Sequence, residues 1–361
     1  PCCDHPLLSE FDDLFRTSVT QICNVALSDD QWTQASLPVR SGGLGVRSVS
    51  KLASSAFLAS AASTLSLQTL ILRRTQVNEI DTIQSMDHWK RLTNDAQAIC
   101  QPQDSSQKAW DTAVVNRSFK ALLDAQTEPY HRARLLAASA AHSGDWLLAM
   151  PISACGLRLT DDAVRVAVGM RLGTELGQVH CCTCGANVDI FGTHAFSCGN
   201  NPGRAQRHHY VNDLIWRSLT RAGIPSVKEP QGLTRSDGKR PDGLTSIPWR
   251  EGRSAIWDVT VTSTVAASYV TMNSVCAASA AEAAAQRKEN KYAEIMRSHL
   301  FYPLAFETMG PINSVSLEFI RDLGHRISRV TDDPRETSFL FQRLSVAIQR
   351  FNAVVFSNSF C

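Results

Sequence analysis

Apolar residues recur at three- and four-residue spacing through the first half of the chain. This spacing runs from Leu7 to about residue 99 and resumes as far as about residue 159. A turn-rich patch, LPVRSGGLG, interrupts it between Leu37 and Gly45. A period near 3.6 residues indicates helices with one buried face. We therefore expect a helical region over residues 1–165.

The pattern changes at about residues 160–175, where short β-branched runs begin to alternate with helical ones. The expected elements are a helix over 205–222, strands over 224–229, 240–247 and 253–262, a helix over 277–299 and a strand over 301–308. Helical spacing returns over 313–330 and 335–357. This order predicts an α+β fold, with an αβββαβ core over 204–310 and carboxy-terminal helices over 311–361.

The composition is that of a folded protein rather than a disordered or fibrous one. Hydrophobic residues make up 43% of the 361 residues and charged residues 19%, which excludes intrinsic disorder. The length favours two or three domains. The chain begins with Pro1 and no basic-then-apolar signal segment follows, so we interpret it as a piece of a longer protein.

Two uncharged runs, 52–72 and 259–281, are long enough to be compared with membrane spans. Both contain many serine and threonine residues, and a span needs about 20 predominantly apolar residues. We expect buried helices and no membrane. The eleven cysteines are an odd number without a secretory signal, which favours a reduced intracellular compartment over a disulfide framework.

A cluster of metal-ligand residues lies in HCCTCGANVDIFGTHAFSC (residues 180–198), within a zinc knuckle expected over residues 175–203. Two thiolates, an imidazole ten positions later and a further thiolate one helical turn on can surround Zn²⁺ as a tetrahedron. The predicted ligands are Cys182, Cys184, His194 and Cys198, with Cys181 as the alternative to Cys182. Four such ligands leave no open position, so the zinc would be structural. The competing interpretation is a set of buried thiols.

A positive segment follows this cluster. Between Arg204 and Arg253 there are ten lysine and arginine residues and five acids, a net charge of +5, whereas the rest of the chain sums to −3. Such a segment is typical of contacts with phosphate groups, although a solvated charged face is the alternative. The candidates for nucleic-acid binding are Arg204, Arg207, His208, Lys239 and Arg240.

Two acids within this region stand at a spacing that suggests a cation site. Asp242 opens one expected strand and Asp258 lies within the next. Adjacent strands would bring the carboxylates together around Mg²⁺, which prefers oxygen ligands. Asp258 follows an apolar run, where an unpaired charge is costly. A later helix carries an alanine stripe that could direct Lys288 toward the carboxylates, although Lys288 and Lys291 could also be ordinary exposed lysines.

Two features of the first half do not indicate chemistry. The acidic pair in Phe11-Asp12-Asp13 resembles a polymerase motif, but it lies in a helical pattern, and we expect a solvated helix face. Gly42, Gly43 and Gly45 lack the lysine and the spacing of a phosphate-binding loop. We expect a turn between helices there.

The chemistry-bearing residues together resemble a known nuclease family. Arg240-Pro241-Asp242, then Asp258, then Lys288 and Lys291 with Tyr292, preceded by the Cys/His cluster and Arg207-His208, is similar to the restriction-like endonuclease domain of non-LTR retrotransposons. That domain is a PD-(D/E)XK nuclease, similar in its core to archaeal Holliday-junction resolvases, with its lysine moved onto a helix. Thr260 stands where the usual lysine would be.

The resemblance extends upstream. The run LPVRSGGLGVRSVSKLASSAFLAS resembles the stretch that follows the palm in the reverse transcriptases of these elements. Residues 1–165 would then correspond to a thumb or linker region. The polymerase's own catalytic aspartates are not in this chain, so we expect no polymerase activity from it.

The resemblance implies a role for each matching position. Asp242 and Asp258 would hold Mg²⁺ with the backbone carbonyl of Val259. Lys288 would orient the water that attacks the phosphodiester, Lys291 would support it, and Glu229 would be an outer acid. Implied partners are target DNA, element RNA and the rest of the polyprotein, in the nucleus. The alternatives are a nucleic-acid-binding remnant without catalysis, and a helical interaction module with a decayed carboxy-terminal part.

Overall fold

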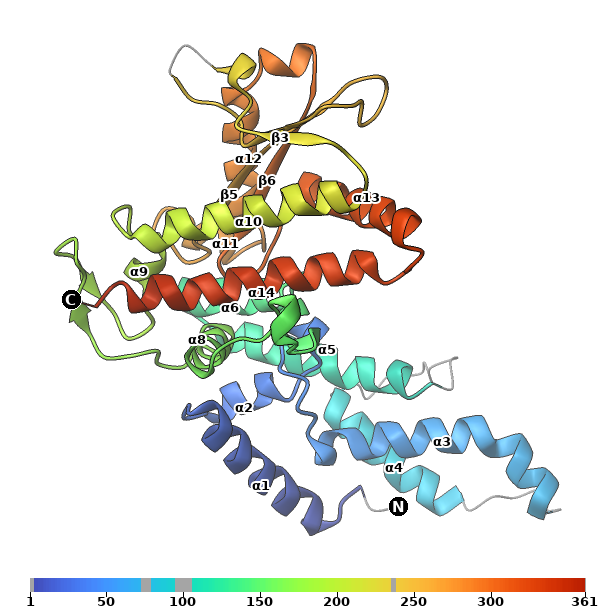
Figure 1. The fold of residues 1–361 in the computed structure, drawn as a ribbon. Helices are drawn as coiled ribbons and strands as arrows, with labels where there is room; N and C mark the ends of the chain where they lie inside the picture. Colours follow the sequence, from blue (N-terminus) through green and yellow to red (C-terminus); the bar gives the residue numbers. More distant parts are fainter. Residues whose placement is uncertain (1–2, 73–78, 95–105, 235–237, 361) are drawn as a thin grey trace. The chain divides into compact units, whose positions relative to one another are not determined.

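The computed structural model describes residues 3–72, 79–94, 106–234 and 238–360 (Figure 1). Contacts divide the chain into two compact units, Pro1–Gln126 and Thr127–Cys361. Together they form a helix-rich α+β protein, as the pattern predicted. The division falls earlier than the expected border at residues 160–175.

The first unit is entirely helical within its described residues. Its elements are α1 (Pro6–Cys23), α2 (Asp29–Ala35), the 3₁₀ turn η1 (Val39–Ser41), α3 (Val49–Leu72), α4 (Glu79–Thr93) and α5 (Gln107–Ala125). The turn expected around the glycines is η1 with its flanking loop. Leu58 of α3, Trp89 of α4 and Trp110 of α5 form a buried cluster. The indole nitrogen of Trp89 donates to the carbonyl oxygen of Trp110 at 3.1 Å, which locks α4 onto α5.

Asp12 does not lie on a solvated face, so that expectation is wrong. Its side chain is buried and accepts hydrogen bonds from the backbone amides of Val49 and Ser50, at 2.8 and 3.2 Å. The hydroxyls of Ser48 and Ser50 donate to it as well. The first amides of a helix have no partner within the helix and carry a positive partial charge. Asp12 therefore caps α3 from another helix.

The second unit begins with helices and a small hairpin. These are α6 (Pro129–Ser139), α7 (Asp145–Leu148), η2 (Ser153–Cys155), α8 (Asp161–Leu172), β1 (His180–Cys181), β2 (Asn187–Val188) and α9 (Thr193–Ser197). The expected border at residues 160–175 passes through α8 and so separates α6 and α7 from the rest of this unit. However, Ala137 of α6 and Val166 of α8 pack in one buried cluster with Val355 and Phe356 near the carboxy terminus. A helical period shows that a face is buried, but not which segment covers it.

The remainder of the second unit follows the expected order of elements. It comprises α10 (Pro202–Arg221), β3 (Ser226–Lys228), η3 (Gln231–Leu233), β4 (Gly243–Thr245), β5 (Ala255–Thr262), α11 (Val270–Asn273), α12 (Ser279–Lys291), η4 (Ile295–Arg297), β6 (Leu300–Glu307), α13 (Ser314–Thr331) and α14 (Glu336–Ser357). The expected helix over 277–299 is the one that differs, since α12 ends at Lys291 and a short 3₁₀ turn follows.

The four-stranded sheet has the order β3-β4-β5-β6. The β3–β4 and β4–β5 pairs are antiparallel, and β5–β6 is parallel. A parallel pair needs a long connection, which α11 and α12 supply here. Gly243 pairs with Trp257, and Leu244 with Ile256.

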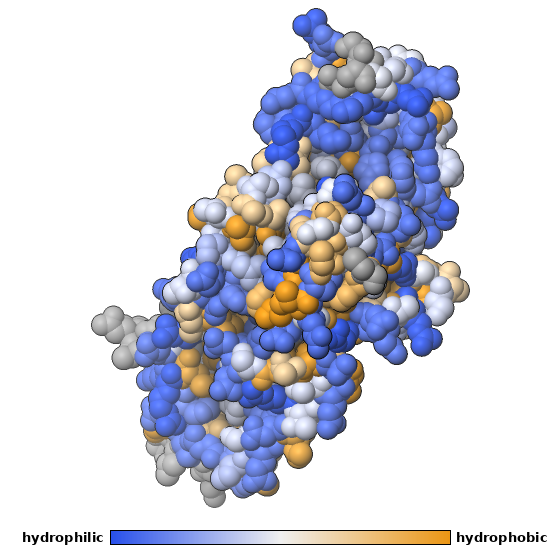
Figure 2. Space-filling model, turned by 90° about the vertical axis from the view of Figure 1, so that its left-hand side faces the viewer, coloured by the Kyte–Doolittle hydropathy of each residue, from blue (hydrophilic) through white to orange (hydrophobic). Residues whose placement is uncertain are grey.

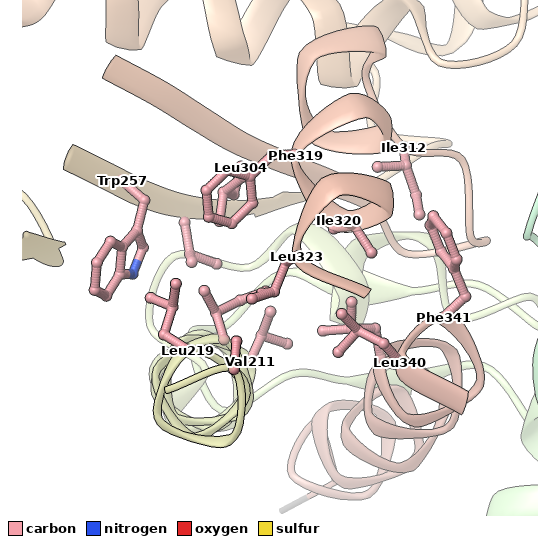
Figure 3. Close-up of a cluster of buried hydrophobic side chains, with 14 of the residues drawn as sticks. Val211, Leu219, Trp257, Leu304, Ile312, Phe319, Ile320, Leu323, Leu340 and Phe341 are labelled. Carbon is pink, nitrogen blue, oxygen red and sulfur yellow. The ribbon is translucent and has the colours of Figure 1, made fainter. Parts of the chain in front are cut away.

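Different helices pack on the two faces of the sheet. Trp257, Val259, Leu304 and Phe306 pack against α10, α13 and α14 in the largest buried cluster among the described residues. Figure 3 shows Trp257 and Leu304 in this cluster. On the opposite face, three alanines of α12 pack on Ala305 of β6. Because side chains alternate along a strand, Asp258 faces away from the large cluster and toward α12.

Among the described residues, no helix has both the length and the apolar character that crossing a bilayer requires. On the face shown in Figure 2, hydrophobic residues occur as limited patches among hydrophilic ones.

The Gly243–Trp257 contact predicts a strong steric effect. A Cβ at residue 243 would lie 1.9 Å from a ring carbon of Trp257, which is fully buried. We expect Gly243→Ala to lower the free energy of unfolding by about 1–3 kcal/mol, the usual cost of overpacking a core. A shift in the urea midpoint measures this loss. Gly232→Ala is the control, because open space surrounds that position; equal midpoints for the two variants would contradict the prediction.

Candidate metal-binding and active site

Two carboxylates meet at the start of β4. The register that pairs Gly243 with Trp257, continued by one residue, places Asp242 opposite Asp258. The Asp258 side chain is 4% exposed and that of Asp242 is 15% exposed. The strand order therefore brings together the two acids that the sequence analysis singled out.

Asp258 has a cationic partner from α12. The ammonium of Lys288 lies 2.7 Å from Oδ1 of Asp258. The alanine stripe acts as expected, since Ala281, Ala284 and Ala285 pack α12 on the sheet. Lys288 is thus not an ordinary exposed lysine. Burial raises the pKa of Asp258, the charge of Asp242 raises it further, and Lys288 opposes both.

Asp242 has two different partners on one oxygen. Its Oδ2 lies 3.0 Å from Nε2 of His208 on α10 and accepts from the backbone amide of Val259 at 2.6 Å. Burial acts to raise the pKa of Asp242, but the bonds from His208 and Val259 outweigh it, and the pKa is lowered. The same hydrogen bond raises the pKa of His208.

The donor set fits a divalent cation. One ligand atom each from His208, Asp242 and Asp258 lies within 4.8 Å of the others. The amide of Val259 points toward Asp242. Within a β-strand, the N–H and C=O groups of any single residue point toward the same neighbouring strand. The carbonyl of Val259 therefore faces β4 as well. Two carboxylates and a carbonyl are oxygen ligands of the kind Mg²⁺ takes.

Tyr292, which follows Lys291, is also part of this site. It is 1% exposed, its hydroxyl donates to the carbonyl of Arg240 at 2.9 Å, and its proximity acts to lower the pKa of Asp258. No separate role was predicted for Tyr292. The local sequence does not indicate which group its hydroxyl reaches.

Two of the predicted catalytic residues, Lys291 and Glu229, lie near the carboxylates, but their side chains make their recorded contacts with other groups. Nζ of Lys291 is 2.9 Å from the Tyr292 hydroxyl and 4.6 Å from the centre of its ring. Glu229 has a side chain that is 61% exposed and faces Arg240, at 3.5 Å. Its backbone amide donates to the carbonyl of Asp242, so Glu229 is near the site through its main chain.

The predicted nucleic-acid contacts divide into buried and exposed groups. Arg207 is only 1% exposed and donates to Asn352 of α14 at 2.7 Å, so its predicted contact with nucleic acid is wrong for this conformation. Arg204 donates to the carbonyls of Ser197 and Cys198. Lys239 and Arg240 are exposed next to Asp242.

Four residues of the Cys/His cluster come together as predicted. Ligand atoms of Cys182, Cys184, His194 and Cys198 all lie within 4.8 Å of one another. The β1–β2 hairpin carries the first two, and α9 with its C-cap carries the others. The sulfurs of Cys182 and Cys198 are 3.9 Å apart, and the sulfur of Cys184 is 3.1 Å from Nε2 of His194. This group could bind a metal such as zinc.

The structure favours Cys182 over Cys181, which the spacing had left open. Cys182 is buried at 2% exposure, and Cys181 is exposed. A hydrogen bond from the backbone of Cys184 lowers the pKa of Cys182, whereas burial raises the pKa of Cys198. Thiolates are the form that zinc binds.

A buried acid at the far end of α12 was not singled out from the sequence. Glu307, at the end of β6, is fully buried and accepts from the backbone amide of Ala281 at 3.1 Å and from the Asn273 side chain at 3.2 Å. Burial raises its pKa to about 7. It caps the amino terminus of the helix that carries Lys288.

Scans against protein-family models and against curated proteins find no match to this chain. Functional assignment therefore rests on the residues and their geometry.

The cluster geometry predicts which cysteine holds zinc. We expect the purified chain to contain one zinc ion per molecule, Cys182→Ser to lose it, and Cys181→Ser to keep it, because only Cys182 lies with the other ligands. Metal analysis after dialysis measures the content. Loss of zinc from Cys181→Ser with retention by Cys182→Ser would reverse the assignment.

Glu307 predicts a pH dependence of stability. Its pKa rises from 4.5 to about 7 on folding, so its contribution to the free energy of unfolding is full below pH 4.5 and is lost as the pH rises to about 7. Glu307→Gln does not titrate and should therefore show a smaller fall in urea midpoint between about pH 5 and about pH 7. The exposed Glu318→Gln is the control; an equal fall in Glu307→Gln and wild type would refute the assignment.

Proposed function

We propose that the second unit is a Mg²⁺-dependent DNA endonuclease. The observation that carries this proposal is the pairing of Lys288 with Asp258 beside Asp242, three groups from three separate elements at one point of the sheet. Two acids and a lysine at this position are what the resemblance to the restriction-like endonuclease domain implies. Burying an acid is costly. Lys288 offsets that cost for Asp258 and, in the same position, places a cation near Asp242 as well.

Each residue has a task in this proposal. Asp242, Asp258 and the carbonyl of Val259 hold the cation. When bound, Mg²⁺ polarises the phosphodiester and favours attack by water in line with the leaving oxygen. Lys288 has N–H groups besides the one directed at Asp258, and these orient the attacking water and neutralise charge that develops on the phosphate. Lys291 donates to the Tyr292 hydroxyl, which in turn holds the Arg240 carbonyl beside the site.

The position of Lys288 supports activity despite the altered strand motif. Thr260 stands two residues after Asp258, where the usual lysine is expected. The ammonium of Lys288 comes from α12 instead and lies 2.7 Å from the Asp258 carboxylate. Catalysis depends on where the charge lies and not on which element supplies it.

Exposed basic residues beside the site support a polyanionic substrate. Lys239 and Arg240 are separated from Asp242 only by Pro241, and the Arg240 carbonyl accepts a hydrogen bond from Tyr292. Positive side chains next to a nuclease centre bind backbone phosphates. The resemblance extends the proposal to cutting target DNA so that its 3′-OH primes reverse transcription. Element RNA, the rest of the polyprotein and a nuclear location belong to that extension.

The proposal predicts metal-dependent nicking of DNA. Incubation of the purified chain with supercoiled plasmid and Mg²⁺ should yield nicked circles, and chelation should stop the reaction. Asp258→Asn should abolish nicking, and Lys288→Met should slow it by about 10²–10³-fold, the usual cost of losing one group that stabilises transition-state charge. The rate of loss of supercoiled plasmid is the measurement.

The control is Glu251→Gln, an exposed acid of the same unit that pairs only with Arg253 among its described contacts. It should nick at the wild-type rate. Plasmid retarded on a gel without nicking, in wild type and variants alike, would replace the nuclease with the nucleic-acid-binding remnant. Neither nicking nor retardation would leave the helical interaction module.

A further inference from the structure

His208 occupies a place in the carboxylate site that nucleic-acid binding does not explain. Its Nε2 is directed at Oδ2 of Asp242, 3.0 Å away, and its side chain is 30% exposed. It forms a group of potential ligands with Asp242 and Asp258. A side chain that contacts a DNA phosphate would face solvent rather than this pair of acids.

The orientation of His208 is fixed by its neighbours on α10. Asn212, four residues later and so on the same helical face, accepts from the indole nitrogen of Trp257 at 2.8 Å. Arg207, one residue earlier, is held by Asn352 of α14. The face that carries His208 is thus anchored to β5 at the residue before Asp258, and the imidazole is preorganised over the site.

The separations suit a shared metal ion. Two ligands about 2.1 Å from an ion, at adjacent corners of an octahedron, lie about 3.0 Å apart. This is the distance between Nε2 of His208 and Oδ2 of Asp242. All three ligand atoms lie within 4.8 Å of one another, so small side-chain movements suffice to surround one cation.

We propose that His208 is a third side-chain ligand of the divalent cation, through Nε2, and that it makes the site prefer a first-row transition-metal ion such as Mn²⁺ to Mg²⁺. Mg²⁺ takes oxygen ligands and dehydrates reluctantly, whereas imidazole nitrogen suits transition-metal ions. The inference rests on the proposed function, because it concerns the same two carboxylates.

The competing role for His208 is to orient Asp242 by the hydrogen bond alone. His208→Gln separates the two roles, because the Gln amide can still donate to Asp242 but supplies no imidazole nitrogen. His209→Gln is the matched control. It removes the adjacent imidazole, which is exposed on α10 and is not among the grouped ligands.

The experiment uses Mn²⁺ as the probe and the full zinc-loaded chain. Continuous-wave EPR measures free Mn²⁺ during a titration, and competition with Mg²⁺ gives the preference. Pulsed EPR detects a directly bound nitrogen through its ¹⁴N modulation. We expect this modulation in wild type and in His209→Gln. In His208→Gln the ¹⁴N modulation should vanish. The affinity for Mn²⁺ should fall at least about 10-fold, because loss of even a residue that only hydrogen bonds to a metal ligand lowers metal affinity by about that factor.

The outcomes distinguish this inference from the nuclease proposal. Mn²⁺ bound without ¹⁴N modulation, lost in Asp242→Asn and unaffected by His208→Gln, would overturn the ligand role of His208 and leave the nuclease standing. Binding that favours Mg²⁺ over Mn²⁺ in wild type would overturn the preference. No Mn²⁺ or Mg²⁺ bound at the carboxylates would refute both proposals.

Discussion

The buried charge of Asp258 is the constraint on which the rest of the second unit depends. A carboxylate this deep in a sheet is unfavourable without a partner, and Lys288 is that partner. The Lys288 ammonium reaches Asp258 only if α12 packs closely on the sheet, which requires small side chains. Ala281, Ala284 and Ala285 are these side chains. Glu307 then fixes the other end of the same helix. The crossover between β5 and β6 is therefore built around one ion pair.

Much of this arrangement could be predicted from local sequence patterns. Strands and helices from residue 205 onward follow their periodicities, and strand adjacency alone indicates that Asp242 and Asp258 meet. The alanine stripe predicted the direction of Lys288, because stripe and lysine share one helical face. The Cys/His spacing identified three of the four grouped residues that could hold a metal, Cys184, His194 and Cys198, and burial then favoured Cys182 over Cys181 as the fourth.

Other parts required the tertiary structure. The Arg207-His208 pair looks like an exposed basic pair in sequence, yet one residue is buried against α14 and the other is directed at Asp242. An aspartate in a helical pattern, such as Asp12, is typical of a solvated face. However, the unpaired backbone amides at the start of α3 donate hydrogen bonds to Asp12. The helical period shows which residues share one face of a helix. It does not show which segment, distant in the sequence, that face packs against.

The position of the division after Gln126 bears on how the protein can be shortened. A fragment that begins at Thr127 keeps α6 and α8 on the helices they cover. One that begins at the border suggested by the sequence, near residue 165, removes α6 and cuts into α8, and so uncovers apolar side chains of α14, among them Phe356. Bare apolar surface of this kind favours self-association. Aggregation of such a fragment would reflect the missing cover and not a defect in the four-stranded sheet and its helices.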